Sequence, residues 1–210
     1  MDAVVKRLLR DAGRTYAEEA GIPLKDQPGP LFRLVVLSNL LSARIGAEIA
    51  MAAARELFEA SGGTARGLAR LTWQQRVDAL DRGHYVRYDE STATHLGDMA
   101  DLVLDRYGGD LRRLAIEAGR DPERAAELLR EFPGIGQVGV DIFCREAQLI
   151  WPWLRPYIDG LALKGAERLG LPADPKRLAD EVPDKDLARF AAALVRVARD
   201  KKLAESILKG

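Results

Sequence analysis

The chain has 210 residues, with 32 basic and 32 acidic side chains, two histidines and one cysteine. This length suits one compact globule or two small lobes. A single cysteine excludes disulfides, cysteine-based zinc sites and an iron–sulfur cluster. A net charge of zero neither favours nor excludes a nucleic-acid partner. The N-terminus lacks a secretory apolar region and no apolar run has membrane-spanning length, so we expect a cytoplasmic protein.

The first part of the chain predicts helices. Residues 2–20 have the pattern of an amphipathic helix that ends at Gly21. Residues 21–30 contain three prolines and two glycines, which is typical of a segment that crosses between lobes. Residues 31–43 are apolar nearly all round and predict a buried central helix. Because no segment has the pattern of a strand, the fold class that we expect is all-α.

The middle and the end of the chain continue this pattern. Thr72 begins a capping box before a helix over residues 73–80. A loop over residues 81–88 separates this helix from a long one over residues 89–107. At the C-terminal end, residues 184–208 predict one final helix with a basic tail.

A turn of sequence Phe132-Pro133-Gly134-Ile135-Gly136 joins two further helical patterns. Upstream, Asp121-Pro122-Glu123 indicates a helix N-terminus, and that helix must stop before Pro133. Downstream, residues 138–150 space their apolar side chains at three and four. The two glycines can adopt positive φ and leave backbone N–H groups exposed at the start of the second helix, which predicts a phosphate-binding site. An ordinary tight turn between helices is the alternative.

An aspartate farther along the chain is the second candidate feature. Tyr157-Ile158-Asp159 precedes a helical segment that carries Arg168-Leu169-Gly170-Leu171. Aspartate is favoured at helix N-caps, so Asp159 is a candidate N-cap of this segment.

The turn and the aspartate, with the spacing from Asp159 to the Arg-Leu-Gly-Leu sequence, resemble the helix-hairpin-helix DNA glycosylases, the superfamily that contains endonuclease III. The resemblance extends loosely upstream to about Pro30. It implies a two-lobed all-α fold with a central cleft. Residues 27–153 would form a helical barrel that contains the hairpin, and residues 1–26 plus 154–210 the second lobe. It also implies a base-excision-repair enzyme, here without the iron–sulfur cluster, that hydrolyses the N-glycosidic bond of a damaged or mismatched base in double-stranded DNA.

The resemblance assigns roles to several side chains. Asp159 would be the catalytic carboxylate that stabilises positive charge on the deoxyribose, and it can cap its helix as well. Arg44, where endonuclease III has a glutamine, and His84 would be wedges that fill the space of an extruded base. Exposed surface positions are the alternative for both. Tyr85 and Tyr88 would line the base pocket, although Tyr85 can instead be a core residue.

Further DNA contacts are expected from the hairpin and from one lysine. The expected contact residues are Gly134, Ile135, Gly136, Gln137, Val138 and Lys164. Asp141, an acid in the helix after the hairpin, would border the base pocket with a role secondary to that of Asp159. The resemblance implies a monovalent cation at the hairpin carbonyls, and we expect no other metal or cofactor.

Strand-cutting members of the family carry a lysine at the position of Val138, and valine has no nucleophilic atom. We therefore expect an enzyme that releases the base with weak or absent lyase activity. We also expect the protein to be a monomer and to be associated with the nucleoid. A bifunctional enzyme that uses another amine stays open, because the hairpin-to-aspartate distance is a few residues longer than in endonuclease III. A non-catalytic helix-hairpin-helix DNA-binding protein and an all-α scaffold without a nucleic-acid partner would also fit the sequence.

Overall fold

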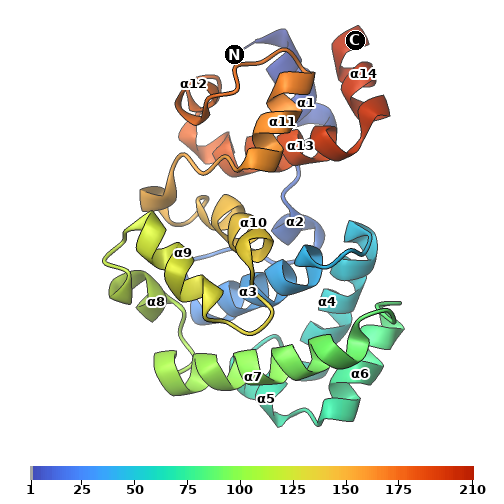
Figure 1. Cartoon of the computed structure of the whole chain (residues 1–210), viewed down its shortest axis with the longest axis vertical. Coiled ribbons are helices and arrows are strands. Elements are labelled where there is room, and N and C mark those ends of the chain that lie inside the picture. The colour runs from blue at the N-terminus through green and yellow to red at the C-terminus, as the bar shows by residue number, and fades with distance from the viewer. Residues whose placement is uncertain (1) are drawn as a thin grey trace. The chain divides into compact units, whose positions relative to one another are not determined.

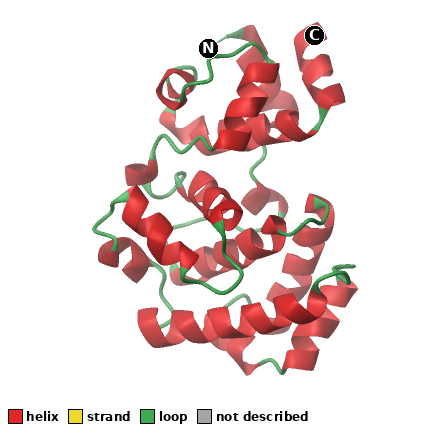
Figure 2. Cartoon of the chain, viewed as in Figure 1, coloured by secondary structure: helices red, strands yellow, loops and turns green. Residues whose placement is uncertain are grey.

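The computed structural model describes residues 2–210, and all regular structure in this part of the chain is helical (Figure 2). The predicted all-α fold class is confirmed. The helices form two compact units (Figure 1). We call Ala17–Phe143 the central unit, and Met1–Tyr16 with Cys144–Gly210 the terminal unit. No helix among the described residues is long and apolar enough to cross a membrane.

The central unit is built around one buried helix. Its elements are α2 (Tyr16–Glu19), α3 (Pro28–Ser42), α4 (Ala47–Ser61), α5 (Ala65–Arg70), α6 (Trp73–Arg82), α7 (Asp89–Tyr107), α8 (Arg112–Glu117), α9 (Pro122–Arg130) and the first part of α10 (Gln137–Ala147). Helix α3 has ten buried residues, which confirms the predicted central helix. It packs on α4, α4 packs on α6, and α7 packs on α5 and α6.

Local sequence signals set where these helices begin. Thr72 accepts a hydrogen bond from the Gln75 backbone N–H at 3.1 Å, and the Gln75 side chain accepts one from the Thr72 N–H at 2.8 Å. The predicted capping box is therefore confirmed. Asp121 caps α9 by accepting from the Arg124 N–H at 2.7 Å, with a proline in the first turn as expected. These caps fix the ends of the helices that lead to the hairpin and to the loop over residues 83–88.

The terminal unit has its core at α13. Its elements are α1 (Ala3–Ala12), the end of α10, η1 (Pro152–Leu154), α11 (Gly160–Arg168), α12 (Pro175–Ala179), η2 (Asp184–Asp186), α13 (Leu187–Arg199) and α14 (Lys201–Lys209). Helix α13 packs against α1, α11 and α14. The predicted boundaries at residues 27 and 153 lie later in the chain than the division between the two units.

Two predicted helices are interrupted. The helix expected over residues 2–20 ends at Ala12, because Gly13 caps it by donating to the Leu9 carbonyl at 3.1 Å. The helix expected over residues 184–208 breaks at Asp200, whose carboxylate accepts hydrogen bonds from two amides of α14. Helix α5 was not predicted. In both interrupted helices a single residue, Gly13 or Asp200, ends or begins a helix within an otherwise continuous helical pattern.

Candidate functional site

The hairpin turn lies between α9 and α10 in the central unit. Phe132 and Ile135 are buried and anchor the turn, and the Ile135 N–H donates to the Phe132 carbonyl at 3.0 Å. Gly134 has a φ of 75°, in the left-handed region that favours glycine. Gly136 is not among the residues with positive φ, so only one of the two glycines uses the freedom that we predicted.

Gly134 is also closely packed. A Cβ atom at this position would lie 2.3 Å from Asn39 Nδ2 and 3.0 Å from His95 Nδ1. Asn39 Nδ2 donates to the carbonyl of Pro133 at 3.3 Å and so ties α3 to the turn. The turn is therefore held by both its backbone conformation and its neighbours, and a side chain at Gly134 would disturb both.

The start of α10 presents a row of backbone donors. Within residues 2–210, the N–H groups of Gly136, Gln137 and Val138 have no protein acceptor. A Cβ at Gly136 would meet nothing within 4 Å, and the Val138 side chain is 51% exposed. The Gln137 side chain is engaged with Arg130 and Asp141, at 2.9 and 2.8 Å. The turn thus leaves open amides at a helix N-terminus, which is the geometry of an anion site.

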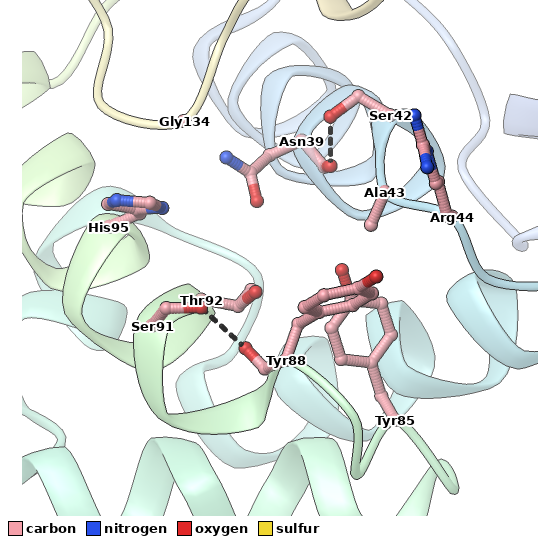
Figure 3. A pocket seen from close by; sticks show the side chains of 10 residues that line it. All are labelled: Asn39, Ser42, Ala43, Arg44, Tyr85, Tyr88, Ser91, Thr92, His95 and Gly134. Carbon is pink, nitrogen blue, oxygen red and sulfur yellow. Dashed lines mark hydrogen bonds between the residues drawn. The ribbon is translucent and has the colours of Figure 1, made fainter.

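A pocket of about 390 Å³ lies beside the turn, within the central unit (Figure 3). Residues from the end of α3, from the loop before α7, from α7 itself and from the hairpin line it: Asn39, Ser42, Ala43, Arg44, Tyr85, Tyr88, Ser91, Thr92, His95 and Gly134. No carboxylate is among these residues. Asp141, which we expected at a base pocket, is not among them either, and its contact with a base stays a prediction.

The two tyrosines of the pocket differ in environment. Tyr85 is 1% exposed, and burial raises the pKa of its phenol while a hydrogen bond with Thr92 opposes this shift. Tyr88 is half-buried, and its carbonyl accepts from the Ser91 hydroxyl at 3.1 Å. In Figure 3 the hydroxyl ends of both rings point toward the end of α3, where Ala43 and Arg44 lie. Tyr85 is thus both a core residue and a lining residue.

The loop before α7 presents exposed side chains, among them those of His84 and Val86. His84 is exposed and has a φ of 64°, which is uncommon for a residue with a side chain. Its N–H donates to the Asp81 carbonyl at 2.8 Å. Val86 is 63% exposed, although sequence analysis did not single it out. Such strained backbone clusters at functional sites, so the loop is a candidate contact with a ligand.

Asp159 lies in the terminal unit as the N-cap of α11, as its sequence context predicted. Its Oδ1 accepts hydrogen bonds from the N–H groups of Leu161 and Ala162, at 2.9 and 3.1 Å. Its Oδ2 accepts from Nη1 of Arg145, and both side chains are 4% exposed. The carboxylate is therefore held by three donors from two helices.

Gln148 holds the segment just before Asp159. Its Oε1 accepts from the Tyr157 N–H at 3.0 Å, and its Nε2 donates to the Tyr157 carbonyl at 2.9 Å. The same Nε2 donates to the Arg145 carbonyl at 3.0 Å. Both Gln148 and Arg145 are buried, and sequence analysis missed them. The available signal was a group of large polar residues, Arg145, Glu146 and Gln148, that follows the apolar run Ile142-Phe143-Cys144 near the end of α10.

Comparison with known proteins shows a similarity of fold but none of sequence family. No family profile matches the chain, and no curated protein matches its sequence. Two solved structures of endonuclease III with DNA match its fold. One is a trapped covalent intermediate, an estranged-adenine complex, at a TM-score of 0.56 and 16% identity over 91% of this chain and 79% of that chain. The other is a non-covalent complex, which matches at a TM-score of 0.54 and 15% sequence identity and covers 91% of this chain and 79% of that chain. The chain has the endonuclease III fold.

The residues of this chain do not fit a cysteine-ligated four-iron cluster. A four-iron cluster needs four cysteine thiolates, whereas this chain has only Cys144, which is buried. No group of three or more histidine, cysteine, aspartate or glutamate side chains among the described residues could hold a metal ion. A monovalent cation at the hairpin stays a prediction.

The remaining predicted residues are exposed positions of the endonuclease III fold. Arg44 lies just after α3, and Lys164 lies on α11 without an ion pair among the described residues. The zero net charge is unevenly divided. The terminal unit has 17 basic and 12 acidic side chains, whereas the central unit has 15 and 20. The terminal unit is therefore net basic by five charges, and it includes Lys164.

Proposed function

We propose that this protein is a base-excision DNA glycosylase that binds damaged or mismatched duplex DNA through its hairpin. The open amides at the start of α10 carry this proposal. Three adjacent donors at a helix N-terminus fit a DNA phosphate, and they bind it whatever the base sequence. The endonuclease III fold, found in complexes with DNA, supports the same partner.

Asp159 is the proposed catalytic residue. A carboxylate has about four acceptor sites, and three of those on Asp159 are filled by Leu161, Ala162 and Arg145. One acceptor position is therefore left for a water molecule or the sugar. Because the donors fix the carboxylate before the reaction, it can stabilise developing positive charge without first reorienting.

In the proposed reaction a water oxygen bonds to C1′ of the deoxyribose, and the bond from C1′ to the base breaks. The base leaves with the electron pair of that bond and takes up one proton, while the attacking water gives up one proton, so the products are the free base and a sugar with a hydroxyl at C1′. Extrusion of the base costs a few kcal/mol, which side chains that fill the vacated space offset. Arg44 and His84 are the proposed wedges, and Tyr85 and Tyr88 are the proposed base-pocket residues.

We also propose that the product is an abasic site on an intact strand. Val138 stands at the position of the family's lysine nucleophile and has no amine. Lys164 is exposed, whereas a lysine nucleophile is activated by an apolar pocket or by a neighbouring cation.

One observation favours a second function, a non-catalytic duplex-binding protein. The buried pair of Arg145 with Asp159 and the capping of α11 are structural uses that would keep the aspartate without any reaction. A panel of duplexes separates the two functions. Duplexes with uracil, mismatched thymine, an alkylated base or an oxidised base are tested for base release, and a duplex with an abasic site is tested for binding and strand cleavage. Release from at least one duplex supports the glycosylase, and binding of all without release supports the binder.

A further inference from the structure

Two buried polar side chains at the end of α10 converge on the segment that carries Asp159. Arg145 reaches the carboxylate itself, and Gln148 holds the Tyr157 backbone two residues earlier. All of these residues belong to the terminal unit. The position of Asp159 is thus set from three sides, by α11, by Arg145 and by Gln148.

The Gln148 contact is a two-point clamp. A carboxamide that accepts from one N–H and donates to the carbonyl of the same residue fixes both the position and the direction of that peptide. Because Nε2 also donates to the Arg145 carbonyl, the clamp and the ion pair share one end of α10. A shift of this end of the helix would move both contacts with the Asp159 segment.

The geometry of the Arg145 contact is not the one that would best stabilise the fold. Arginine binds a carboxylate most strongly through two parallel N–H groups. Here Nη1 alone reaches Asp159, and Arg145 Nε is buried without a hydrogen-bond partner. An unsatisfied buried donor costs stability, and buried ion pairs give little net stabilisation against apolar side chains. A role in orienting Asp159 accounts for this arrangement better than a role in stability.

We propose that Arg145 and Gln148 are positioning residues for Asp159. Arg145 holds Oδ2, Gln148 holds the peptide at Tyr157, and together they aim the remaining acceptor site of the carboxylate at the reacting sugar. This inference rests on the proposed glycosylase function. Neither residue touches the substrate, so both act on the rate of base release and not on the affinity for DNA.

The test uses the full chain and a duplex from which the wild-type protein releases a base. The variants are Arg145→Met, Arg145→Lys and Gln148→Met. Arg189→Met is the matched control, since Arg189 also makes a helix-to-loop contact in the terminal unit, through its bond to the Gly13 carbonyl at 2.7 Å. Single-turnover rates and duplex Kd are measured for each variant, well below its thermal unfolding midpoint.

A small misplacement of a reacting group can cost about a hundredfold in rate, and we expect this loss for Arg145→Met and Gln148→Met. Their duplex Kd should stay within about tenfold of wild type. Arg145→Lys should recover part of the rate, and Arg189→Met should keep all of it despite any loss of stability. If Arg145→Met does not fold, the single-turnover rates and duplex Kd of Arg145→Lys and Gln148→Met provide the test.

Two results would overturn the inference, and they differ. If Arg145→Met and Gln148→Met fold and release the base at the wild-type rate, the two side chains have only a structural role. The glycosylase function would then stand without the positioning role. If the wild-type protein binds duplex DNA but releases no base from any duplex of the panel, the proposed glycosylase function is wrong. The positioning role, which depends on that function, is then wrong as well.

Discussion

Arg145 donates a hydrogen bond through Nη1 to Oδ2 of Asp159, and both side chains are 4% exposed. The same carboxylate caps α11 through its other oxygen. One aspartate therefore serves a helix cap, a buried ion pair and, in the proposed function, the reaction. Substitutions at these two positions can separate the three tasks, because asparagine keeps the cap while it removes the charge.

The free energy of unfolding should depend on whether both charges of the buried Arg145–Asp159 pair are present. Removal of one partner of a buried ion pair leaves the other uncompensated, so Arg145→Met should lower the free energy of unfolding by about 3 kcal/mol. The double variant Arg145→Met, Asp159→Asn should recover most of this loss, because no buried charge remains and asparagine is a good N-cap. Urea unfolding at neutral pH measures both values. Equal losses in the single and double variants would contradict a charge effect.

The hairpin glycines should behave differently from each other. Gly136→Ala has room for its Cβ, so the protein should fold with near wild-type stability but bind every duplex more weakly, since the added methyl group lies beside the open amides. Gly134→Ala should lose about 1–3 kcal/mol of stability, because alanine is strained at a φ of 75° and meets Asn39.

Gly29→Ala is the matched control for Gly136→Ala, since a Cβ there also meets nothing within 4 Å and its φ is not positive. Thermal unfolding and fluorescence anisotropy with duplexes of several sequences provide the measurements. Wild-type affinity in folded Gly136→Ala would make the turn a simple connector.

The loop over residues 83–88, which carries the proposed wedge His84, allows a test in which the variant keeps its fold. His84→Gly relieves the strain of a φ of 64° but makes the unfolded chain more flexible, so the free energy of unfolding should stay within about 1 kcal/mol of wild type. Loss of the imidazole should reduce base extrusion, which 2-aminopurine fluorescence in the duplex reports. Val86→Ala, in the same loop, shows whether the exposed valine shares this task. Unchanged extrusion in both variants would argue against a wedge in this loop.

Sequence patterns predicted the parts of the fold that depend on neighbouring residues. The capping box at Thr72, the cap at Asp121 and the buried α3 are set by residues within one or two turns. The breaks after α1 and before α14 were missed, because one glycine or one aspartate decides them against a continuing helical pattern. The pairing of Arg145 with Asp159 could not be predicted, since it joins two helices across a connecting segment whose path the sequence does not fix.

The same limit applies to the pocket of the central unit. Tyr85 and Tyr88, which we predicted at a base pocket, line the pocket of the central unit. Asn39 lies on α3 and His95 on α7, and both lie beside Gly134, so their place beside the turn follows from packing. Whether a base enters this pocket stays a prediction.

The product of the reaction should be an abasic site on an uncut strand. Val138 cannot form a Schiff base, and Lys164 is exposed rather than enclosed in an apolar pocket. Borohydride added during turnover on a processed duplex should therefore give no covalent protein–DNA adduct. An adduct would show that another amine attacks the sugar, and mapping of its attachment site would identify that residue.

The most direct measurement is the single-turnover rate of base release by Asp159→Asn, on a duplex that the wild-type protein processes. Base release should be abolished while the duplex Kd stays within about tenfold of wild type, or about 1.4 kcal/mol, because asparagine preserves the cap of α11 and leaves the hairpin unchanged. Wild-type rates in correctly folded Asp159→Asn would contradict this prediction.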